Sequence, residues 1–191
     1  KWQHRNPDVR QLEVENLENP EILSEIAQND EAAQVRQAAV QKINELDLLA
    51  QIARQDADSG VQELAKQRLK TLLCAQTDGC PALDARLTWL KQTTDAEVIA
   101  YIAKQGHEIE LRLAAISQVA HEEVLGDIAI NDRKSDVRFA AVDKLTQKSI
   151  LERVVKAARH SDKRISRFAR EKLDQVIEQM ERPTRVLAEC E

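Results

Sequence analysis

Apolar residues along this chain recur in a stripe that returns about every 26 residues. The stripe begins at an anchor residue, and the steps between successive anchors are 26, 26, 50, 26 and 28. Apolar side chains mostly follow each anchor after three, four and eight residues, which places them on one face of an α-helix. The pattern therefore predicts an amphipathic helix at each of six anchors: Val9, Val35, Val61, Leu111, Val137 and Ile165.

A second apolar pattern with the same period lies between these helices. It consists of two apolar pairs four residues apart, first at positions 22–27, and later copies begin at Leu48, Val98, Val124 and Ile150. Asn19 with Pro20 marks the start of the first of these helices, because Asn caps a helix and Pro is tolerated in its first turn. Asp47 and Asp95 are further candidate caps. Each repeat is thus predicted to contain two helices of about three turns.

The long step from Val61 to Leu111 indicates a degenerate repeat, since at 50 it is two short of a double period. We place this repeat at residues 72–93, with Leu72 and Leu73 at the start of its first helix. The segment 77–81 reads Thr-Asp-Gly-Cys-Pro and is the best loop candidate in the chain. A second helix is expected to follow and to carry leucines at positions 83, 87 and 90.

The helix pairs resemble HEAT repeats, in which a turn Asp is followed about six residues later by an Arg that opens the second helix. The pair is present as Asp30 with Arg36 and as Asp132 with Arg138. Two turns depart from the pattern, with Gln62 in place of the Arg and Gly106 in place of the Asp. The period and the resemblance together predict an all-α fold, an α-solenoid of HEAT-like helix pairs that forms a single array over residues 1–180.

The opening segment Lys1-Trp2-Gln3-His4, followed by such repeats, carries a second resemblance. It is similar to the N-terminal helical-repeat region of bacterial proteins of unknown function that continue into charged helical repeats. That resemblance supplies no activity to transfer. It implies that residues 181–191 are a tail or the start of a following helical region.

The composition agrees with a helical repeat. Only 3% of the residues are aromatic, which argues against one large core, and 32% are charged, as suits the exposed faces of amphipathic helices. No stretch of the sequence approaches the roughly 20 apolar residues of a membrane span. The three cysteines, Cys74, Cys80 and Cys190, make an odd number, and free thiols in a reducing compartment are the simplest interpretation. We expect a cytoplasmic monomer.

The residues that most often carry chemistry are dispersed. The histidines at positions 4, 107, 121 and 160 fall in different repeats, and no two stand four residues apart on one helix. Cys74 and Cys80 are separated by five residues, a spacing of neither a redox motif nor a zinc site. With four glycines the chain has no glycine-rich phosphate loop. The sequence therefore predicts no enzymatic activity, no cofactor and no metal.

A repeated arginine stands directly after four of the anchors, as Arg10, Arg36, Arg112 and Arg138. These side chains could form a basic ladder that binds a partner. An Arg beside a turn Asp more often links successive repeats through paired hydrogen bonds, and we favour this structural role for Asp30, Arg36, Asp132 and Arg138.

Charge is distributed unevenly along the chain. Residues 144–172 contain ten Lys or Arg and three carboxylates, a formal charge of +7 in a chain of net charge −5. The candidate binding residues within this segment are Lys156, Arg159, Lys163, Arg164, Arg167 and Arg170. Such a patch attracts an acidic protein segment or a nucleic-acid backbone, or it is a solvated face without a partner.

Two functions follow as hypotheses. The first is a non-enzymatic scaffold that binds a protein partner through exposed residues of the second helices. The alternative is a nucleic-acid-binding module that uses the basic C-terminal repeats, although the scarcity of aromatic side chains for base stacking weighs against it. No membrane partner is expected.

Overall fold

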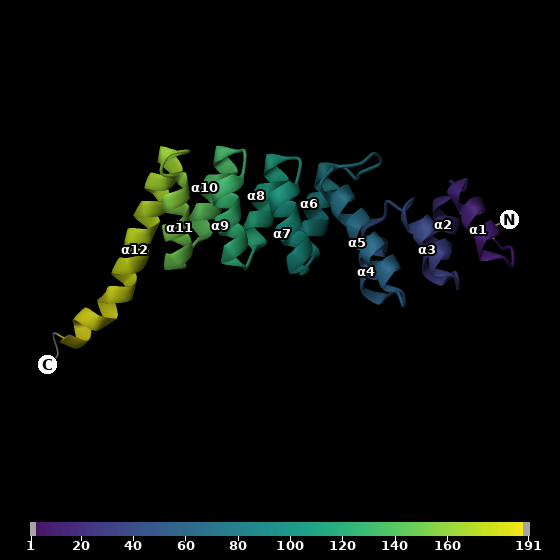
Figure 1. Cartoon of the computed structure of the whole chain (residues 1–191), viewed down its shortest axis with the longest axis horizontal. Coiled ribbons are helices and arrows are strands. Elements are labelled where there is room, and N and C mark those ends of the chain that lie inside the picture. Colours follow the sequence, from purple (N-terminus) through teal and green to yellow (C-terminus); the bar gives the residue numbers. More distant parts are fainter. Residues whose placement is uncertain (1–2, 189–191) are drawn as a thin grey trace. The chain divides into compact units, whose positions relative to one another are not determined.

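The computed structural model describes the backbone of residues 3–188 and the side chains of residues 3–181. Within these residues the fold is all-α and solenoid-like, with twelve helices packed in sequential pairs and no β-strand (Figure 1). Most helices start 13 residues after the start of the preceding helix, which is half of the 26-residue apolar period. The helices are α1 Pro7–Glu15, α2 Pro20–Asn29, α3 Ala33–Val40, α4 Leu46–Gln55, α5 Ser59–Leu73, α6 Leu83–Gln92, α7 Ala96–Gln105, α8 Ile109–Gln118, α9 Glu122–Asn131, α10 Ser135–Lys144, α11 Lys148–Ala158 and α12 Lys163–Ala188.

The chain divides into two compact units, Lys1–Trp89 and Leu90–Glu191. Unit 1 contains α1 to α5 and most of α6, and unit 2 contains α7 to α12. The boundary falls in the degenerate repeat identified from the sequence. The single array expected over residues 1–180 stays a prediction, while each unit by itself has the expected paired helices.

Two classes of helix alternate within each unit. The helices that contain the anchors are called B helices here, namely α1, α3, α5, α8, α10 and α12, and the helices α2, α4, α7, α9 and α11 are called A helices. Each A helix packs against the B helix that follows it, as in α4 with α5 and α11 with α12. Successive B helices also pack side by side, α1 with α3 and α10 with α12 among them. The core is the row of apolar side chains between the two classes.

Small residues permit this close stacking. Ala39, Ala115 and Ala141 lie four residues after their anchors and are each 0% exposed, which confirms the expected burial. On the A side, a Cβ atom at Gly126 of α9 would lie 2.7 Å from Cγ2 of Ile150 in α11. The glycine is therefore required by the close approach of the two helices.

Two of the three predicted helix caps are confirmed. The side chain of Asn19 accepts a hydrogen bond from the backbone N–H of Ile22, and Asp95 accepts from the N–H of Val98. Asp47 is not a cap, because α4 begins one residue before it and Glu45 occupies the capping position. Asp47 lies in the first turn, where its charge favours the positive end of the helix.

The degenerate repeat differs from its prediction in one helix. Leu72 and Leu73 end α5 instead of starting a new helix, so α5 has 15 residues and the expected first helix is missing. A loop from residue 74 to residue 82 takes its place, and Gly79 adopts a positive φ of 74° there, which favours glycine. The expected second helix is α6.

The last helix is longer than the others. α12 has 26 residues and continues to Ala188 through the segment predicted as a tail or the start of a following helical region, and residues 189–191 lie outside the described part. Among the described residues no helix is both long and apolar enough to cross a membrane.

Candidate interaction surfaces

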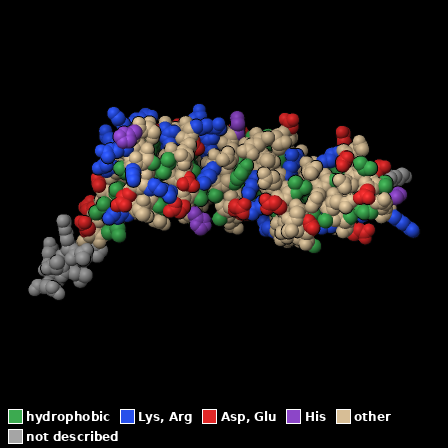
Figure 2. All heavy atoms as spheres, viewed as in Figure 1, with side chains coloured by type: hydrophobic (Ala, Val, Ile, Leu, Met, Phe, Trp, Pro, Cys, Tyr) green, Lys and Arg blue, Asp and Glu red, His purple; other side chains and the backbone are tan. Residues whose placement is uncertain are grey.

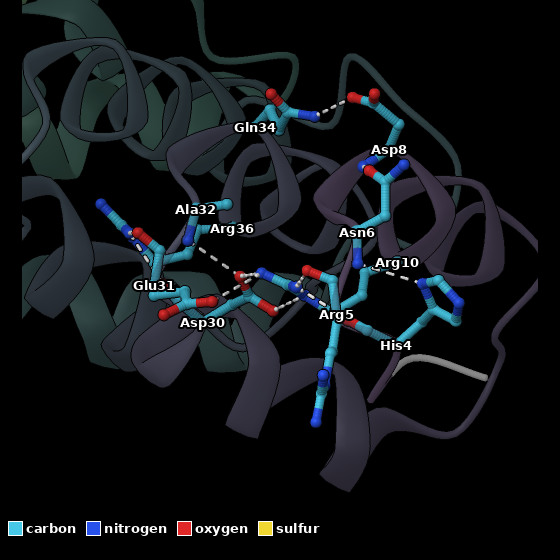
Figure 3. A network of polar contacts seen from close by, with 10 residues as sticks. All are labelled: His4, Arg5, Asn6, Asp8, Arg10, Asp30, Glu31, Ala32, Gln34 and Arg36. Carbon is cyan, nitrogen blue, oxygen red and sulfur yellow. Dashed lines mark hydrogen bonds and ion pairs between the residues drawn. The ribbon is translucent and has the colours of Figure 1, made fainter.

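The repeated arginines of unit 1 connect successive turns. Arg10 donates from Nε and Nη2 to the Asp30 carboxylate at 2.9 and 2.8 Å, and Arg36 does the same to Asp56 at 2.8 and 2.7 Å. Each arginine also donates from Nη1 to a backbone carbonyl six residues before it, that of His4 or Asp30, at 2.8 Å. Figure 3 shows this network around Arg10 and Asp30. One guanidinium thus holds its own turn and the next.

The turn carboxylates also close their own turns through a backbone hydrogen bond. One oxygen of Asp30 accepts from the N–H of Ala32, two residues on, and Asp56 accepts likewise from Asp58. His4 stands at the equivalent place in the first turn, where its Nδ1 accepts from the N–H of Asn6 (Figure 3). Each turn is therefore closed by one side chain. Where that side chain is a carboxylate, the arginine of the preceding B helix also binds it.

Unit 2 repeats the arrangement with fewer bonds. Arg112 donates to the Gly106 carbonyl at 2.9 Å and to Asp132 at 3.4 Å, and Arg138 donates to the Asp132 carbonyl and to Asp162, both at 2.6 Å. Among the described residues, Nε of both arginines has no partner.

These contacts fix the protonation of the carboxylates. Hydrogen bonds from Arg36 hold the pKa of Asp56 below its ordinary value, although burial acts in the opposite direction. Arg138 lowers the pKa of Asp162 in the same way. At Asp30 burial is the largest influence and would raise the pKa, but the hydrogen bonds from Arg10 and Ala32 and the positive charges of Arg10 and Arg36 together lower it. All three carboxylates are thus charged at neutral pH.

The sequence predicts the arginines that stack the repeats but not all of their partners. The carboxylate bound by Arg36 belongs to the next turn, while its own turn residue Asp30 contributes the backbone carbonyl. One member was missed. Arg86 of α6 is 3% exposed and donates to the carbonyls of Pro81 and Leu73. Its position, one period before Arg112, was the signal that could have identified it.

A second set of cations, also missed, ties the ends of the B helices together. Each stands seven residues after an anchor and donates to a carbonyl at or near the end of the preceding B helix. Lys42 binds the Glu15 carbonyl at 2.8 Å, Lys144 that of Ser117 at 2.7 Å, and Lys172 that of Asp143 at 2.6 Å. Such cations satisfy carbonyls that lack partners within their own helix. Lys144 and Lys172 are therefore structural, although both lie in the basic segment.

The six candidate cations of the last helix pair are all exposed. Arg167 forms an ion pair with Glu171 at 3.0 Å, in which the Arg167 side chain is 82% exposed. Among the described residues the side chains of the other five have no hydrogen bond or ion pair; they are Lys156, Arg159, Lys163, Arg164 and Arg170. The structure thus leaves most of this charge available to solvent or to a ligand.

The same cationic surface extends to the neighbouring repeat. Figure 2 shows Lys and Arg side chains gathered over the α11–α12 turn and over the turn between α9 and α10. The latter turn contributes Arg133 and Lys134, both exposed. We call the eight cations the basic edge: Arg133, Lys134, Lys156, Arg159, Lys163, Arg164, Arg167 and Arg170.

A different surface lies along the B helices of unit 2. The residues two and three after the anchors are half-buried and apolar on α8 and α10, and Phe168 continues them on α12. Phe139 and Phe168 pack against each other across the α10–α12 contact, with ring centroids 5.5 Å apart. We call this surface the apolar B face: Leu113, Ala114, Phe139, Ala140 and Phe168. The corresponding second positions in unit 1 are polar, namely Gln11, Gln37 and Glu63.

The other residues that could bind a ligand or react are dispersed or already bonded to each other. A hollow of about 450 Å³ beside α1 and α2 is lined by His4, Arg10, Glu25 and Asp30 among others, but Arg10 and Asp30 are bonded to each other there. Among the described residues no group of three or more His, Cys, Asp or Glu could hold a metal ion. Cys74 is buried and Cys80 half-buried, and neither forms a disulfide, while Cys190 lies outside the described residues.

The comparisons with known proteins give no family for this chain. No family model, no curated protein and no solved structure matches it.

Proposed function

We propose that this chain is a non-enzymatic, HEAT-like interaction scaffold that binds a protein partner through the apolar B face of unit 2. The single observation that supports this most is the change at the second position after the anchor. It is polar on α1, α3 and α5, becomes Leu113 on α8 and Phe139 on α10, and is Arg167 of the basic edge on α12. Phe139 also packs on Phe168 across the α10–α12 contact, but α1, α3 and α5 pack side by side with polar residues at this position, so the stacking of B helices does not require an apolar side chain there.

The composition of this face supports a protein partner. Aromatic side chains are enriched in the centres of protein interfaces, which are surrounded by polar rims. Here the half-buried Phe139 and Phe168 have charged neighbours of both signs, with Asp136 and Asp143 one turn away on α10 and Arg164 one turn away on α12. A partner with an apolar side-chain row and a mixed polar border would complement this surface.

The polar network supports the non-enzymatic part of the proposal. The guanidinium groups of Arg10 and Arg36 are saturated by the turns that they connect, and the carboxylates Asp30 and Asp56 are bound to them. A catalytic group must exchange protons or contact substrate, and these groups are occupied in holding the array. The candidates Asp30, Arg36, Asp132 and Arg138 therefore enter the proposal as stacking residues.

The test adds charge to the apolar B face without removing core side chains. Ala114 and Ala140 are half-buried at the third position after their anchors, and Ala38 of unit 1 is a matched control at the same position. Ala114→Arg and Ala140→Arg, each made singly in the full-length protein, should remove the same set of proteins from an affinity purification read by quantitative mass spectrometry. Ala38→Arg should retain that set.

A direct binding measurement with the purified partner should then follow. We expect each unit 2 variant to weaken binding by at least tenfold, because a cation placed in an apolar contact must be desolvated. Circular dichroism should show unchanged helix content. Partners that survive both unit 2 variants, or that are lost equally with Ala38→Arg, would contradict the assignment of the face.

A further inference from the structure

The basic edge is separate from the apolar B face in its chemistry. Seven of its eight cations have no partner among the described residues, and the eighth, Arg167, is bound only to the exposed Glu171. We infer that this edge is a second binding site, and that its ligand is the phosphodiester backbone of duplex nucleic acid, recognised without regard to sequence.

The nearby carboxylates do not neutralise the edge. Asp162 is engaged by Arg138 and by the N–H groups of Arg164 and Ile165. Glu152 lies 3.9 Å from Lys148, a lysine outside the edge. Asp132 is bound by Arg112 and by the N–H of Lys134. Asp136, Glu171 and Asp174 remain within a turn of these cations, and three carboxylates cannot balance eight cations, so the edge keeps a positive potential that attracts polyanions.

The arginine network holds the two turns that carry these cations. Asp132 closes the α9–α10 turn, which presents Arg133 and Lys134, and Asp162 closes the start of α12, which presents Lys163 and Arg164. Arg138 links the two turns by bonding to the carbonyl of Asp132 and to the carboxylate of Asp162. The backbone beneath the edge is therefore fixed before any ligand arrives, which lowers the ordering cost of binding.

The edge lacks the features of a protein interface. The exposed residues between its cations include Asn131, Ala157, His160 and Ser161, and none is a large apolar side chain. Stable protein interfaces need an apolar or aromatic centre, which the B face has and the edge does not. The edge contains no Phe, Tyr or Trp side chain on which successive unpaired bases could stack, and His160 is the one ring among the exposed residues named here, so the edge favours a duplex over a single strand.

Energetics distinguishes a nucleic acid from an acidic peptide. Each exposed ion pair contributes little to the free energy of binding, so a flexible acidic peptide, which also loses conformational entropy, would bind such a surface weakly. A duplex concentrates one charge per about 1.7 Å of its axis, and each phosphate neutralised by Lys or Arg releases condensed counterions. The same eight exposed cations therefore gain most from a duplex backbone.

The experiment measures fluorescence anisotropy of a labelled 20-base-pair DNA duplex with the full chain, at several KCl concentrations. We expect a Kd of about 1–100 μM at low salt, equal for two unrelated sequences. The logarithm of the binding constant should fall with the logarithm of salt concentration with a slope of about −4 to −7, as five to eight phosphate contacts predict.

Two variants of the basic edge and one control variant test whether the duplex binds at the edge. The triple variant Lys163→Glu, Arg167→Glu and Arg170→Glu should weaken binding at least thirtyfold and reduce the magnitude of the slope by about 3. The double variant Arg133→Glu and Lys134→Glu should weaken it at least fivefold. The control, Arg5→Glu, Arg54→Glu and Lys91→Glu, changes net charge as much as the triple variant at exposed cations outside the edge, and it should stay within threefold of the parent.

Competitors separate the sources of negative charge. Unlabelled duplex should displace the probe, whereas poly-glutamate at equal charge concentration and vesicles of phosphatidylserine and phosphatidylcholine should not. Displacement by poly-glutamate would overturn the inference in favour of an acidic protein segment, and displacement by the vesicles would overturn it in favour of lipid headgroups. Equal loss of binding in the control and the triple variant, or no binding to the duplex at low salt, would also overturn it.

Discussion

The pair formed by Arg36 and Asp56 gives the sharpest test of how the repeats are held together. The Arg36 side chain is 11% exposed and the Asp56 carboxylate 6%, and they share two hydrogen bonds of 2.8 and 2.7 Å. Replacing Arg36 with Gln should leave this carboxylate buried without its cation. Breaking a fully buried pair from one side costs about 3–5 kcal/mol, and we expect about 2–4 kcal/mol here because the turn reaches the surface.

Gln is chosen because the chain already has a Gln at the equivalent position of the next repeat. Gln62 stands at the equivalent position one repeat later and donates from Nε2 to the Asp56 carbonyl at 2.6 Å. Gln at position 36 can make the same bond to the Asp30 carbonyl, so the substitution removes the carboxylate contact and preserves the carbonyl contact. The measured loss then reports on the link between successive turns.

The assay is urea unfolding followed by circular dichroism, performed as a double-mutant cycle with Asp56→Asn. Each single variant should lower the free energy of unfolding of unit 1 by about 2–4 kcal/mol, and the double variant should lose less than the sum by about 1–3 kcal/mol. If unfolding shows two transitions, the one that shifts belongs to unit 1. Single losses below about 0.5 kcal/mol, with no coupling, would refute the structural role of the arginines.

Two further predictions concern packing and pH. Ala115→Leu should destabilise unit 2 by about 1–3 kcal/mol through overpacking, whereas Ala114→Leu, one residue away and half-buried, should cost less than about 1 kcal/mol; equal thermal shifts would contradict the helix register. Because the pKa values of Asp56 and Asp162 lie below their ordinary value of 3.8 in the folded state, the stability that these carboxylates contribute is complete above that pH and is lost as the pH falls through the lower folded-state values. Thermal unfolding between pH 7 and pH 2 should therefore show a smaller acid loss for Asp56→Asn than for the parent chain, and an unchanged acid loss would contradict the pKa direction.

Much of the fold follows from the sequence because stacking repeats impose one residue type at one position. Burial at the fourth position after the anchor selects alanine, as at Ala39, Ala115 and Ala141. The spacing between the turn Asp and the following Arg reflects a turn that the carboxylate closes. The missing helix of the degenerate repeat could not be predicted in the same way. Leu72 and Leu73 fit the end of a long helix as well as the start of a new one, and neither Gly nor Pro separates them from the preceding anchor helix.

The candidate surfaces were only partly predictable, for a spatial reason. The spacing of Lys163, Arg167 and Arg170 on one helix placed them together on an exposed face. Arg133 and Lys134 belong to the preceding repeat and join them only because successive turns stack at one edge of unit 2. The apolar B face does not follow from the pattern of buried positions, because the informative position is the second one after the anchor, where the half-buried Phe139 stands.

The most direct measurement of the central proposal is photo-crosslinking from the B helices of the full-length protein in cells. A photoreactive amino acid at position 140, on the apolar B face of α10, should give a discrete protein adduct that mass spectrometry can identify. The same amino acid at position 38, the equivalent place on α3 of unit 1, should not give that adduct. An adduct from position 140 that disappears with Ala114→Arg is the result the scaffold proposal predicts, and the absence of any specific adduct from position 140 would contradict it.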